Sequence, residues 1–499
     1  MFKNKVIIIG SGLGGLSTAL LLSKNGYDVS VYEQSTQVGG CLQCFMRNGV
    51  KFETGMHFIG SADTGQTLDK LLTYLEIKDS ICLSRLDPKG YDVVSILGSS
   101  YKFANGRDNF IEQMAYYFPS QKDNLKRYFD LVELVAGASS VHSLKNAESD
   151  SAINTEYQLR SINEVIDSII TDPLLAKVLV GNLPLYAAEK DKTPFSTHAF
   201  IVDFYNQSSY RVVGGSDSIA KALVKRIELY GGQVHTLKKV TKINCNNERA
   251  TSVVINDDEV VEADYIISAI HPKRTLELID SKLIRPAFRN RINSIPQTSG
   301  VFSVYVHFKE NTVPYMNYNF YGYNYDNPWG CESYDESTWP KGYLYMHQCH
   351  ESSPSFAKTG VILSYMKINE LVKWFGTHVG RRGLEYEEFK KEKAKKLISS
   401  LEKHFPGLRN NICHYYTSTP LTYLDYTGTE DGSMYGCAKD ITLGTACRVP
   451  HRTKIPNVLL TGQNINSHGI LGVLVGTIVT CSDFLTSDTI YKQIINSNV

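Results

Sequence analysis

The chain has 499 residues, of which 42% are hydrophobic and 21% are charged, as in ordinary globular proteins of about two or three domains. This composition excludes a mainly disordered chain. The net charge of +1, from 52 basic and 51 acidic residues, argues against a nucleic-acid partner. The 10 cysteines are scattered and too few for a disulfide scaffold, so we expect reduced thiols in a reducing compartment.

A strand–helix–strand pattern opens the chain. Residues 6–9 are a β-branched run, which is typical of a strand buried on both faces of a parallel sheet. Glycines follow, and residues 16–24 predict a helix that is closed by Asn25 and Gly26. Residues 29–33 predict the second strand of a βαβ unit. The first run is too short and too interrupted by glycine for a signal peptide.

The next part of the chain, from about residue 64 to residue 204, is expected to be mostly helical. Residues 109–118 predict one helix, and Pro119 ends it. Ser120 is expected to cap a second helix that reaches about residue 135. The stretch from there to residue 156 is rich in Ser, Ala and Asn, so we expect a loop.

Strand patterns return in the second half of the chain. Segments that alternate or run apolar between turn residues predict strands at residues 234–243, 250–255, 265–270 and 301–308. An apolar stripe predicts a long helix over residues 385–405. Residues 470–481 are strongly apolar but carry two glycines and are too short to span a bilayer. We therefore expect a buried core helix there.

The first glycines form a dinucleotide-binding motif. Residues 10–15 read GSGLGG and fit G-x-G-x-x-G, with a strand before and a helix after. Gly10 permits the tight turn, Gly12 lets the backbone approach a pyrophosphate, and Gly15 allows the helix to pack on the strand. Glu33 ends the next strand, 18 residues after Gly15, where a carboxylate accepts hydrogen bonds from ribose hydroxyls.

Two further features favour FAD over NAD as the dinucleotide. The glycine pair at residues 39–40 follows the second strand, and residues 52–55, FETG, come soon after it. Near the C-terminus, residues 457–462 predict a strand and a glycine turn, and an apolar helix interrupted by glycine follows. The N-terminus of such a helix suits the anionic edge of a flavin.

These blocks together resemble the FAD-dependent phytoene desaturase, carotenoid isomerase and retinol saturase superfamily, which is related more distantly to the monoamine oxidases. The resemblance covers nearly the whole chain. Its blocks are residues 7–60, the segments between residues 213 and 272, and residues 459–472, LLTGQNINSHGILG. Residues 54–60, TGMHFIG, and 419–436 are similar to the isomerase and saturase branch.

The sequence departs from the pattern of that superfamily at three places. Glu53 stands where Asp is usual, Cys41 stands where the desaturases commonly have Arg, and His468-Gly469 replaces Pro-Gly. These changes bear on the substrate more than on the flavin.

The resemblance implies an α/β (α+β) fold with a discontinuous Rossmann-like FAD-binding domain and an inserted substrate domain of mixed sheet and helix. The expected FAD-binding segments are residues 1–66, 205–275 and 455–499. The expected substrate segments are residues 67–204 and 276–454. The residues expected at the cofactor are Gly10, Gly12, Leu13, Gly14, Gly15, Glu33, Gln34, Gly39, Gly40, Cys41, Gly55, Met56, His57, Val240, Gly462, Gln463, Gly472 and Val473.

The implied activity is flavin hydride transfer at carbon–carbon double bonds of a hydrophobic polyene or isoprenoid, such as a carotenoid or retinoid. Saturation, desaturation and isomerisation stay open, and NAD(P)H, oxygen or a quinone are options for the electron partner. His57 is a candidate proton donor, because a histidine transfers protons near neutral pH, and His468, in the loop before the last helix, is a second candidate. For each of them a structural histidine is the alternative. An amine oxidase and a non-catalytic flavin-binding protein are the competing functions.

Several other motifs have ordinary explanations. Residues 41–44 read C-x-x-C, which fits either a dithiol relay to the flavin or two buried thiols. The spacing of His347, Cys349 and His350 suits no familiar metal site, so we expect none. Tyrosines over residues 315–325, with Tyr343 and Tyr345, suit an apolar tunnel or half-buried positions in a sheet. A cytoplasmic protein is expected, with peripheral membrane contact at the inner face and the oligomeric state left open.

Overall fold

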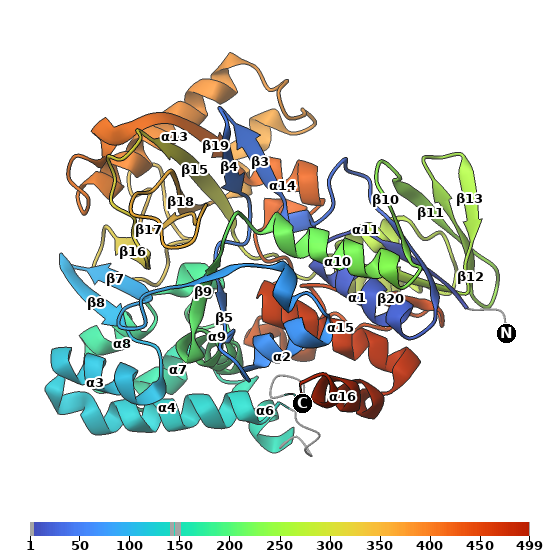
Figure 1. Ribbon diagram of the computed structural model, residues 1–499, viewed down its shortest axis with the longest axis horizontal. Coiled ribbons are helices and arrows are strands. Elements are labelled where there is room, and N and C mark those ends of the chain that lie inside the picture. The colour runs from blue at the N-terminus through green and yellow to red at the C-terminus, as the bar shows by residue number, and fades with distance from the viewer. Residues whose placement is uncertain (1–3, 140–143, 145–150, 499) are drawn as a thin grey trace.

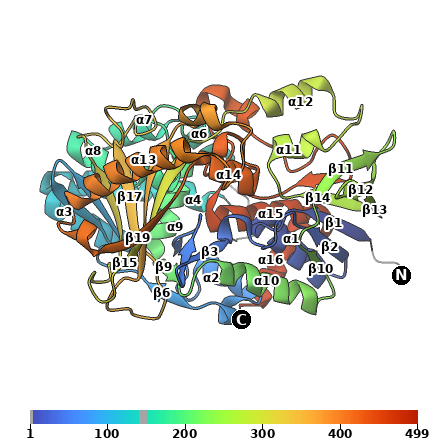
Figure 2. The ribbon, with the colours of Figure 1, turned by 90° about the horizontal axis from the view of Figure 1, so that it is seen from above.

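The computed structural model describes residues 4–139, 144 and 151–498, and it has two bodies side by side. One body is built on a five-stranded parallel sheet and lies nearest the N-terminus in Figure 1. The other is built on a seven-stranded sheet, which is seen almost edge-on in Figure 2. The mixed α/β class predicted from the sequence is confirmed.

The parallel sheet begins with the predicted βαβ unit. β1 (Lys5–Ile9), α1 (Leu13–Lys24) and β2 (Asp28–Tyr32) follow one another directly, and β1 pairs in parallel with β2. The helix begins at Leu13, three residues earlier than the apolar pattern predicts, because two glycines of the motif lie inside its first turn.

Distant parts of the chain complete this sheet, whose order is β10-β2-β1-β14-β20. Its other strands are β10 (Gln233–His235), β14 (Tyr265–Ser268) and β20 (Val458–Leu460). All five strands therefore come from residues 1–66, 205–275 and 455–499. The division into domains stays a prediction, since α2 (Thr67–Tyr74), just outside the first segment, contacts the C-terminal helix α16 (Ser487–Asn496).

Helices cover the parallel sheet. α1 contacts α10 (Asp217–Leu229) and α15 (Gly469–Leu485). Of the predicted residues 470–481 in α15, all but Val479 are buried, so the predicted core helix is confirmed. Among the described helices, none alone is long and apolar enough to cross a membrane. α15 and α16 meet the length and composition criteria only together, with a bend of 117° between them.

A small antiparallel sheet flanks this body. It consists of β11 (Val240–Cys245), β12 (Ala250–Ile255) and β13 (Glu259–Glu262). The prediction of one strand over residues 234–243 is wrong, because the chain leaves the parallel sheet after β10 and turns before β11. Leu237 makes that turn with a φ of 58°, a left-handed conformation that apolar spacing does not reveal.

The seven-stranded sheet has the order β19-β15-β18-β17-β16-β7-β8 and is antiparallel except between β7 and β16. Its strands are β7 (Asp92–Ile96), β8 (Ser99–Phe103), β15 (Gly300–Phe308), β16 (Asn319–Tyr323), β17 (Gly342–His347), β18 (Thr359–Met366) and β19 (Ile412–Ser418). All of them fall within residues 67–204 and 276–454.

Two short sheets connect the bodies. β3 (Cys44–Arg47) and β4 (Val50–Glu53) form a hairpin. β5 (Ile59–Gly60), β9 (Ser209–Val212) and β6 (Leu83–Arg85) form a three-stranded sheet in that order. The expectation that residues 64–204 are mostly helical is wrong at β6, β7 and β8. Every residue of β7 is buried, so the period of two that identifies a half-exposed strand is missing.

Helices pack around the seven-stranded sheet. They are α3 (Arg107–Tyr117), α4 (Lys122–Gly137), α6 (Ser151–Tyr157), α7 (Ile162–Asp167), α8 (Pro173–Leu179), α9 (Phe195–Gln207), α13 (Leu384–Glu402) and α14 (Pro420–Thr427). The helices α11 (Pro272–Glu277) and α12 (Pro286–Asn293) contact each other and pack instead beside β11 and β12 in the other body. Ser120 does not cap α4. The capping position is Gln121, after a 3₁₀ turn at residues 119–121.

The loop expected before residue 156 is wrong at its end, where α6 begins at Ser151. Residues 140–143 and 145–150 of that stretch lie outside the described residues.

The tyrosines of the second half serve the sheet. Tyr345 packs edge-on against Phe405 with ring centroids 5.2 Å apart, and the Tyr343 hydroxyl lies 2.6 Å from Nδ1 of His404. On the other face of the sheet, Tyr323 donates to the carbonyl oxygen of Gly181 at 2.6 Å. Sheet packing therefore accounts for these side chains, the second of the two explanations offered for them.

A buried carboxyl in β7 makes stability depend on pH. Burial raises the pKa of Asp92 to about 7, although Arg211 and neighbouring amides oppose the shift. The folded state therefore keeps a proton that the unfolded chain, with a pKa of about 3.9, releases at lower pH. The contribution of Asp92 to the free energy of unfolding is therefore fully present below about pH 4 and is lost as the pH rises to about 7. Above that pH it changes no further.

We expect Asp92→Asn to remove this dependence. The new amide keeps the acceptor for Asn319, 2.8 Å away, and can donate to the side-chain oxygen of Asn182, which has no partner. In urea unfolding, the free energy of unfolding of Asp92→Asn should exceed that of the parent protein by at most about 4 kcal/mol at pH 8 and by almost nothing at pH 4. The exposed control Asp79→Asn should show no such trend, and equal gains at both pH values would contradict the assignment.

Candidate functional site

The glycine motif forms a cradle at the N-terminus of α1. Gly10 has a φ of 93°, which a side chain rarely adopts. A Cβ on Gly15 would lie 2.1 Å from the carbonyl oxygen of Gly10, and one on Gly14 would lie 2.7 Å from the Cα of Gly462. A Cβ on Gly12, by contrast, would meet nothing within 4 Å. Among the glycines of the motif, only Gly12 therefore has open space beside it. A diphosphate in that space would face the free N–H groups of the helix.

The second glycine pair lies against this cradle. The Gly39 N–H donates to the carbonyl oxygen of Ser11 at 2.9 Å, and Gly12 and Gly39 form an isolated parallel bridge. A Cβ on Gly40 would lie 3.1 Å from the Cα of Gly12. The next residue, Cys41, contacts Gly55. The predicted residues 39–41 and 55 therefore line one continuous path away from the motif.

Glu33 ends β2 beside the cradle, as predicted. Its Oε2 accepts from the N–H and the hydroxyl of Ser11 at 3.0 and 2.6 Å, and its Oε1 accepts from the Ser35 N–H at 2.8 Å. The Lys238 N–H donates to the backbone oxygen of Glu33 at 2.8 Å, which brings the chain leading to Val240 alongside. The contact of Ser11 with Glu33 was not predicted, because the G-x-G-x-x-G motif accepts any residue at position 11.

We expect Glu33→Ala to weaken flavin retention by about 1–3 kcal/mol, because ribose hydroxyls and the Ser11 loop lose their acceptor. Fluorescence titration of the stripped protein with FAD measures this change. The exposed control Glu262→Ala should bind FAD as the parent protein does. An unchanged affinity in Glu33→Ala would remove Glu33 from the cofactor site.

His57 lies in the segment that follows β4, and it is 8% exposed. Its Nδ1 is 3.6 Å from Oε2 of Glu53, and it makes no hydrogen bond. Oε1 of Glu53 accepts from the Ser216 N–H at 3.1 Å, beside the start of α10. The buried Arg211 donates to the backbone oxygen of His57 at 3.2 Å. Glu53 and Arg211 therefore fix a histidine that was predicted without them.

The two cysteines of the C-x-x-C motif are not activated. Burial raises the pKa of the Cys41 and Cys44 thiols to about 11 each. A redox dithiol needs a thiolate near neutral pH, so this environment favours two ordinary buried thiols.

The C-terminal block meets the cradle from the other side. Gly462 has a φ of 99° and touches Gly14, and Val473 lies 3.4 Å from the position of a Cβ on Gly14. A Cβ on Gly472 would lie 2.6 Å from the Cβ of Ser467, so the loop folds tightly onto the start of α15. This brings Gly462, Gly472 and Val473 together with the glycine motif, as predicted; Gln463 is half-buried in the same loop.

Three further predicted positions differ in their surroundings. Leu13 is half-buried at the start of α1, Met56 is half-buried beside His57, and Gln34 is exposed beyond Glu33. The side chain of Gln34 therefore contributes little to the enclosed part of the site.

The histidines near residue 350 are engaged within the protein. Nδ1 of His347 accepts from the Met316 N–H at 2.9 Å, and its Nε2 lies 2.5 Å from the Tyr345 hydroxyl. His350 pairs with the Thr359 hydroxyl. Across the described residues, no three His, Cys, Asp or Glu side chains gather as a metal site would require.

A profile of the family described as flavin containing amine oxidoreductase matches residues 13–473. The chain belongs to this family. The match begins inside the glycine motif at Leu13, includes the segment of His57 and ends in the first turns of α15. Membership of this family shows that the protein is a flavin-containing oxidoreductase. It agrees with the superfamily resemblance found in the sequence.

Individual relatives refine the comparison. This chain is 26% identical over 541 residues to all-trans-retinol 13,14-reductase from Rattus norvegicus, and the similarity covers 99% of this chain and 87% of the relative. It is 27% identical over 282 residues to 4,4'-diaponeurosporene oxygenase from Staphylococcus aureus, covering 53% and 55%. An oxidoreductase structure from Methanosarcina mazei has the same fold, with a TM-score of 0.65, 17% identity and coverage of 96% and 100%.

Proposed function

We propose that this protein is a FAD-dependent oxidoreductase that reduces a carbon–carbon double bond of a hydrophobic polyene or isoprenoid. The observation that carries the proposal is the similarity to a retinol 13,14-reductase over 99% of the chain. The shorter similarity to a carotenoid-type oxygenase concerns a polyene as well. Among saturation, desaturation and isomerisation, the near full-length relative favours saturation.

The cradle fits the diphosphate of FAD. The space before Gly12 admits a phosphate, and the N–H groups of α1 hold its charge. Glu33 would accept hydrogen bonds from the ribose hydroxyls, and the backbone of Val240 would meet the adenine. The path through Gly40 and Gly55 and the start of α15 hold the flavin end. When bound, the flavin supplies the hydride chemistry of the reaction.

In this proposal, His57 donates the proton to the carbon of the double bond that does not receive the hydride. Glu53 is the acidic neighbour of this histidine, since its Oε2 lies 3.6 Å from Nδ1 and both side chains are buried. The carboxylate lies on the Nδ1 side of the ring, which would leave Nε2 for the substrate. Arg211 holds the backbone of the histidine in place.

Electrons must enter from outside the chain. One G-x-G-x-x-G motif is evident in the sequence, and it is assigned to FAD. We therefore propose that NAD(P)H or another reductant binds transiently.

The test begins with the absorbance spectrum and mass of the cofactor released from the purified protein. Anaerobic incubation with dithionite and all-trans-retinol or a carotenoid follows, with product analysis by chromatography. A product heavier by two hydrogens supports the proposal. Oxidation of putrescine or another amine would favour the amine oxidase alternative, which the family description suggests. Bound FAD without turnover of any donor or acceptor would favour a flavin-binding protein.

A further inference from the structure

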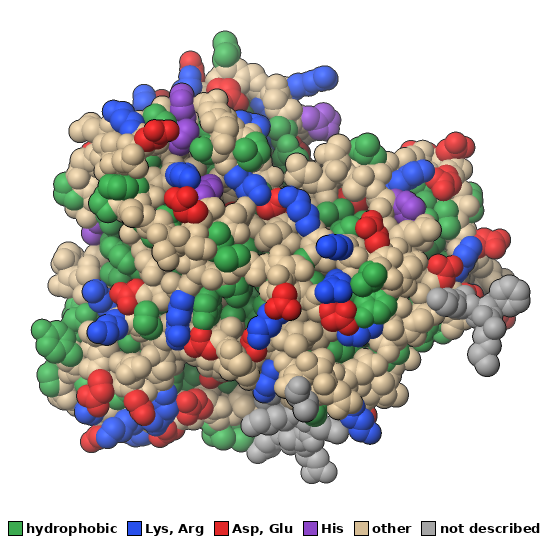
Figure 3. Space-filling view, in the orientation of Figure 1, with side chains coloured by type: hydrophobic (Ala, Val, Ile, Leu, Met, Phe, Trp, Pro, Cys, Tyr) green, Lys and Arg blue, Asp and Glu red, His purple; other side chains and the backbone are tan. Residues whose placement is uncertain are grey.

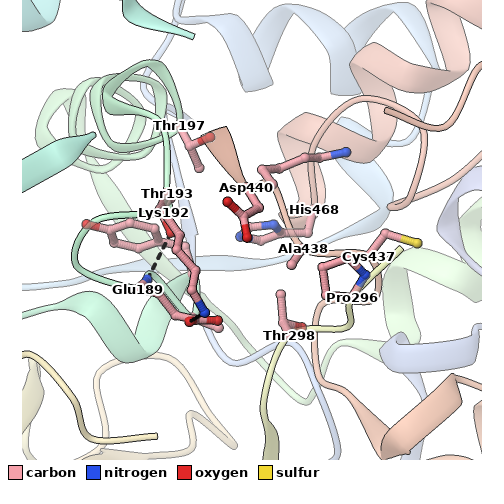
Figure 4. Close-up of a pocket in the computed structure, with 13 residues that line it drawn as sticks. Glu189, Lys192, Thr193, Thr197, Pro296, Thr298, Cys437, Ala438, Asp440 and His468 are labelled. Carbon is pink, nitrogen blue, oxygen red and sulfur yellow. Dashed lines mark hydrogen bonds and ion pairs between the residues drawn. The ribbon is translucent and has the colours of Figure 1, made fainter. Parts of the chain in front are cut away.

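A small polar cavity lies beside the C-terminal block, with a volume of about 40 Å³. Figure 4 shows that segments from distant parts of the chain surround it, including Thr193 and Thr197, Pro296 and Thr298, and Asp440 with His468. Polar atoms and small apolar side chains share its wall, so it suits a small polar group attached to an apolar ligand.

His468 is the unsatisfied group of this wall. The residue is 8% exposed, and its Nε2 has no hydrogen-bond partner. Its ring lies against Tyr435, with the centroids 4.3 Å apart, so the imidazole is held in one orientation. A buried polar atom without a partner is costly, and a ligand that enters the cavity can supply the missing hydrogen bond.

The charges around the cavity balance. Lys192 pairs with Glu189 at 2.5 Å. Asp440 accepts from the N–H and hydroxyl of Thr442, and the Lys439 ammonium donates to the backbone oxygen of Asn464 at 3.4 Å. Two acidic and two basic residues thus line the cavity, and burial keeps His468 neutral by lowering its pKa to about 3. A neutral polar group fits such a wall better than a carboxylate or a cation.

We propose that this cavity binds the hydroxyl end of a polyene alcohol, with a hydrogen bond to Nε2 of His468. The proposal rests on the proposed function and names its substrate subclass, an alcohol rather than a hydrocarbon carotenoid. His468 begins α15 and lies in the loop from Gly462, which touches the glycine cradle. A hydroxyl held there is next to the cofactor end of the site. In all-trans-retinol only one carbon separates the hydroxyl from the 13,14 bond, so the same anchor would keep that bond at this end of the site.

Equilibrium binding tests the anchor without turnover. The FAD-loaded protein and its His468→Leu variant are titrated with all-trans-retinol and with the hydrocarbon that has hydrogen in place of the hydroxyl, and protein fluorescence is followed. We expect His468→Leu to weaken retinol binding about tenfold, as the loss of one buried hydrogen bond predicts, and to leave hydrocarbon binding unchanged. His468→Gln should restore much of the difference, and the exposed control His378→Leu should resemble the parent.

The outcomes separate this proposal from the function on which it rests. Equal weakening for both ligands, or no change for either, overturns the hydroxyl anchor while reduction of a polyene by the parent protein still supports the function. Binding of neither ligand by the FAD-loaded parent overturns both. In turnover, the anchor predicts a higher KM for retinol in His468→Leu with the KM for the hydrocarbon unchanged.

Discussion

Gly12→Val should yield a folded protein without flavin. The backbone of Gly12 has φ −64° and ψ 173°, an extended conformation that valine favours. A side chain there meets no protein atom within 4 Å of its Cβ. The fold should therefore tolerate the change, whereas a diphosphate bound in this space would be displaced by the side chain. We expect FAD affinity to fall by roughly 100-fold or more, seen as a colourless protein with a normal far-ultraviolet circular dichroism spectrum.

A matched control sits on α4. Gly137 also has open space around a Cβ, so Gly137→Val tests the general cost of the substitution away from the cradle and should stay yellow. Gly15→Ala is the opposite control, because its Cβ would clash with Gly10 and damage the fold itself. A Gly12→Val protein that binds FAD normally would show that the diphosphate lies elsewhere.

His57→Gln should lower polyene reduction by about 10²–10⁴-fold, the usual contribution of a general acid, while flavin content stays normal. Glutamine fills a similar volume and can still face Glu53, so folding should be preserved. The measurement compares turnover under saturating reductant with the rate at which dithionite reduces the bound flavin. Only turnover should fall, since the second rate needs no proton transfer to a polyene.

Two further variants test whether the loss of turnover is specific to His57. Glu53→Gln removes the carboxylate beside Nδ1 but keeps an acceptor for Ser216, so turnover should fall while the flavin content stays normal. The exposed control His414→Gln should change nothing. Equal turnover in His57→Gln and the parent would make His57 a structural residue and leave the proton to another donor.

The nucleotide half of the molecule could be predicted because its signals are local. Glycine spacing, a β-branched run and an acidic residue at the end of the next strand all lie within residues 6–33, and each acts on its near neighbours. The closures at Gly14 and Gly15 follow directly from such short-range packing. Errors arose where burial is complete, as in β7, or where a left-handed residue such as Leu237 redirects the chain.

The amino-acid sequence alone determined the dinucleotide cradle, the mixed fold and the family resemblance. Only the tertiary structure decided what surrounds the reacting groups. Ser216 reaches Glu53 across 163 residues and Arg211 reaches His57 across 154, and the cavity of His468 draws its wall from four separate segments. Contacts of this kind leave no periodic trace in a sequence, because they depend on how two sheets and their connecting strands pack rather than on the residues next in the chain.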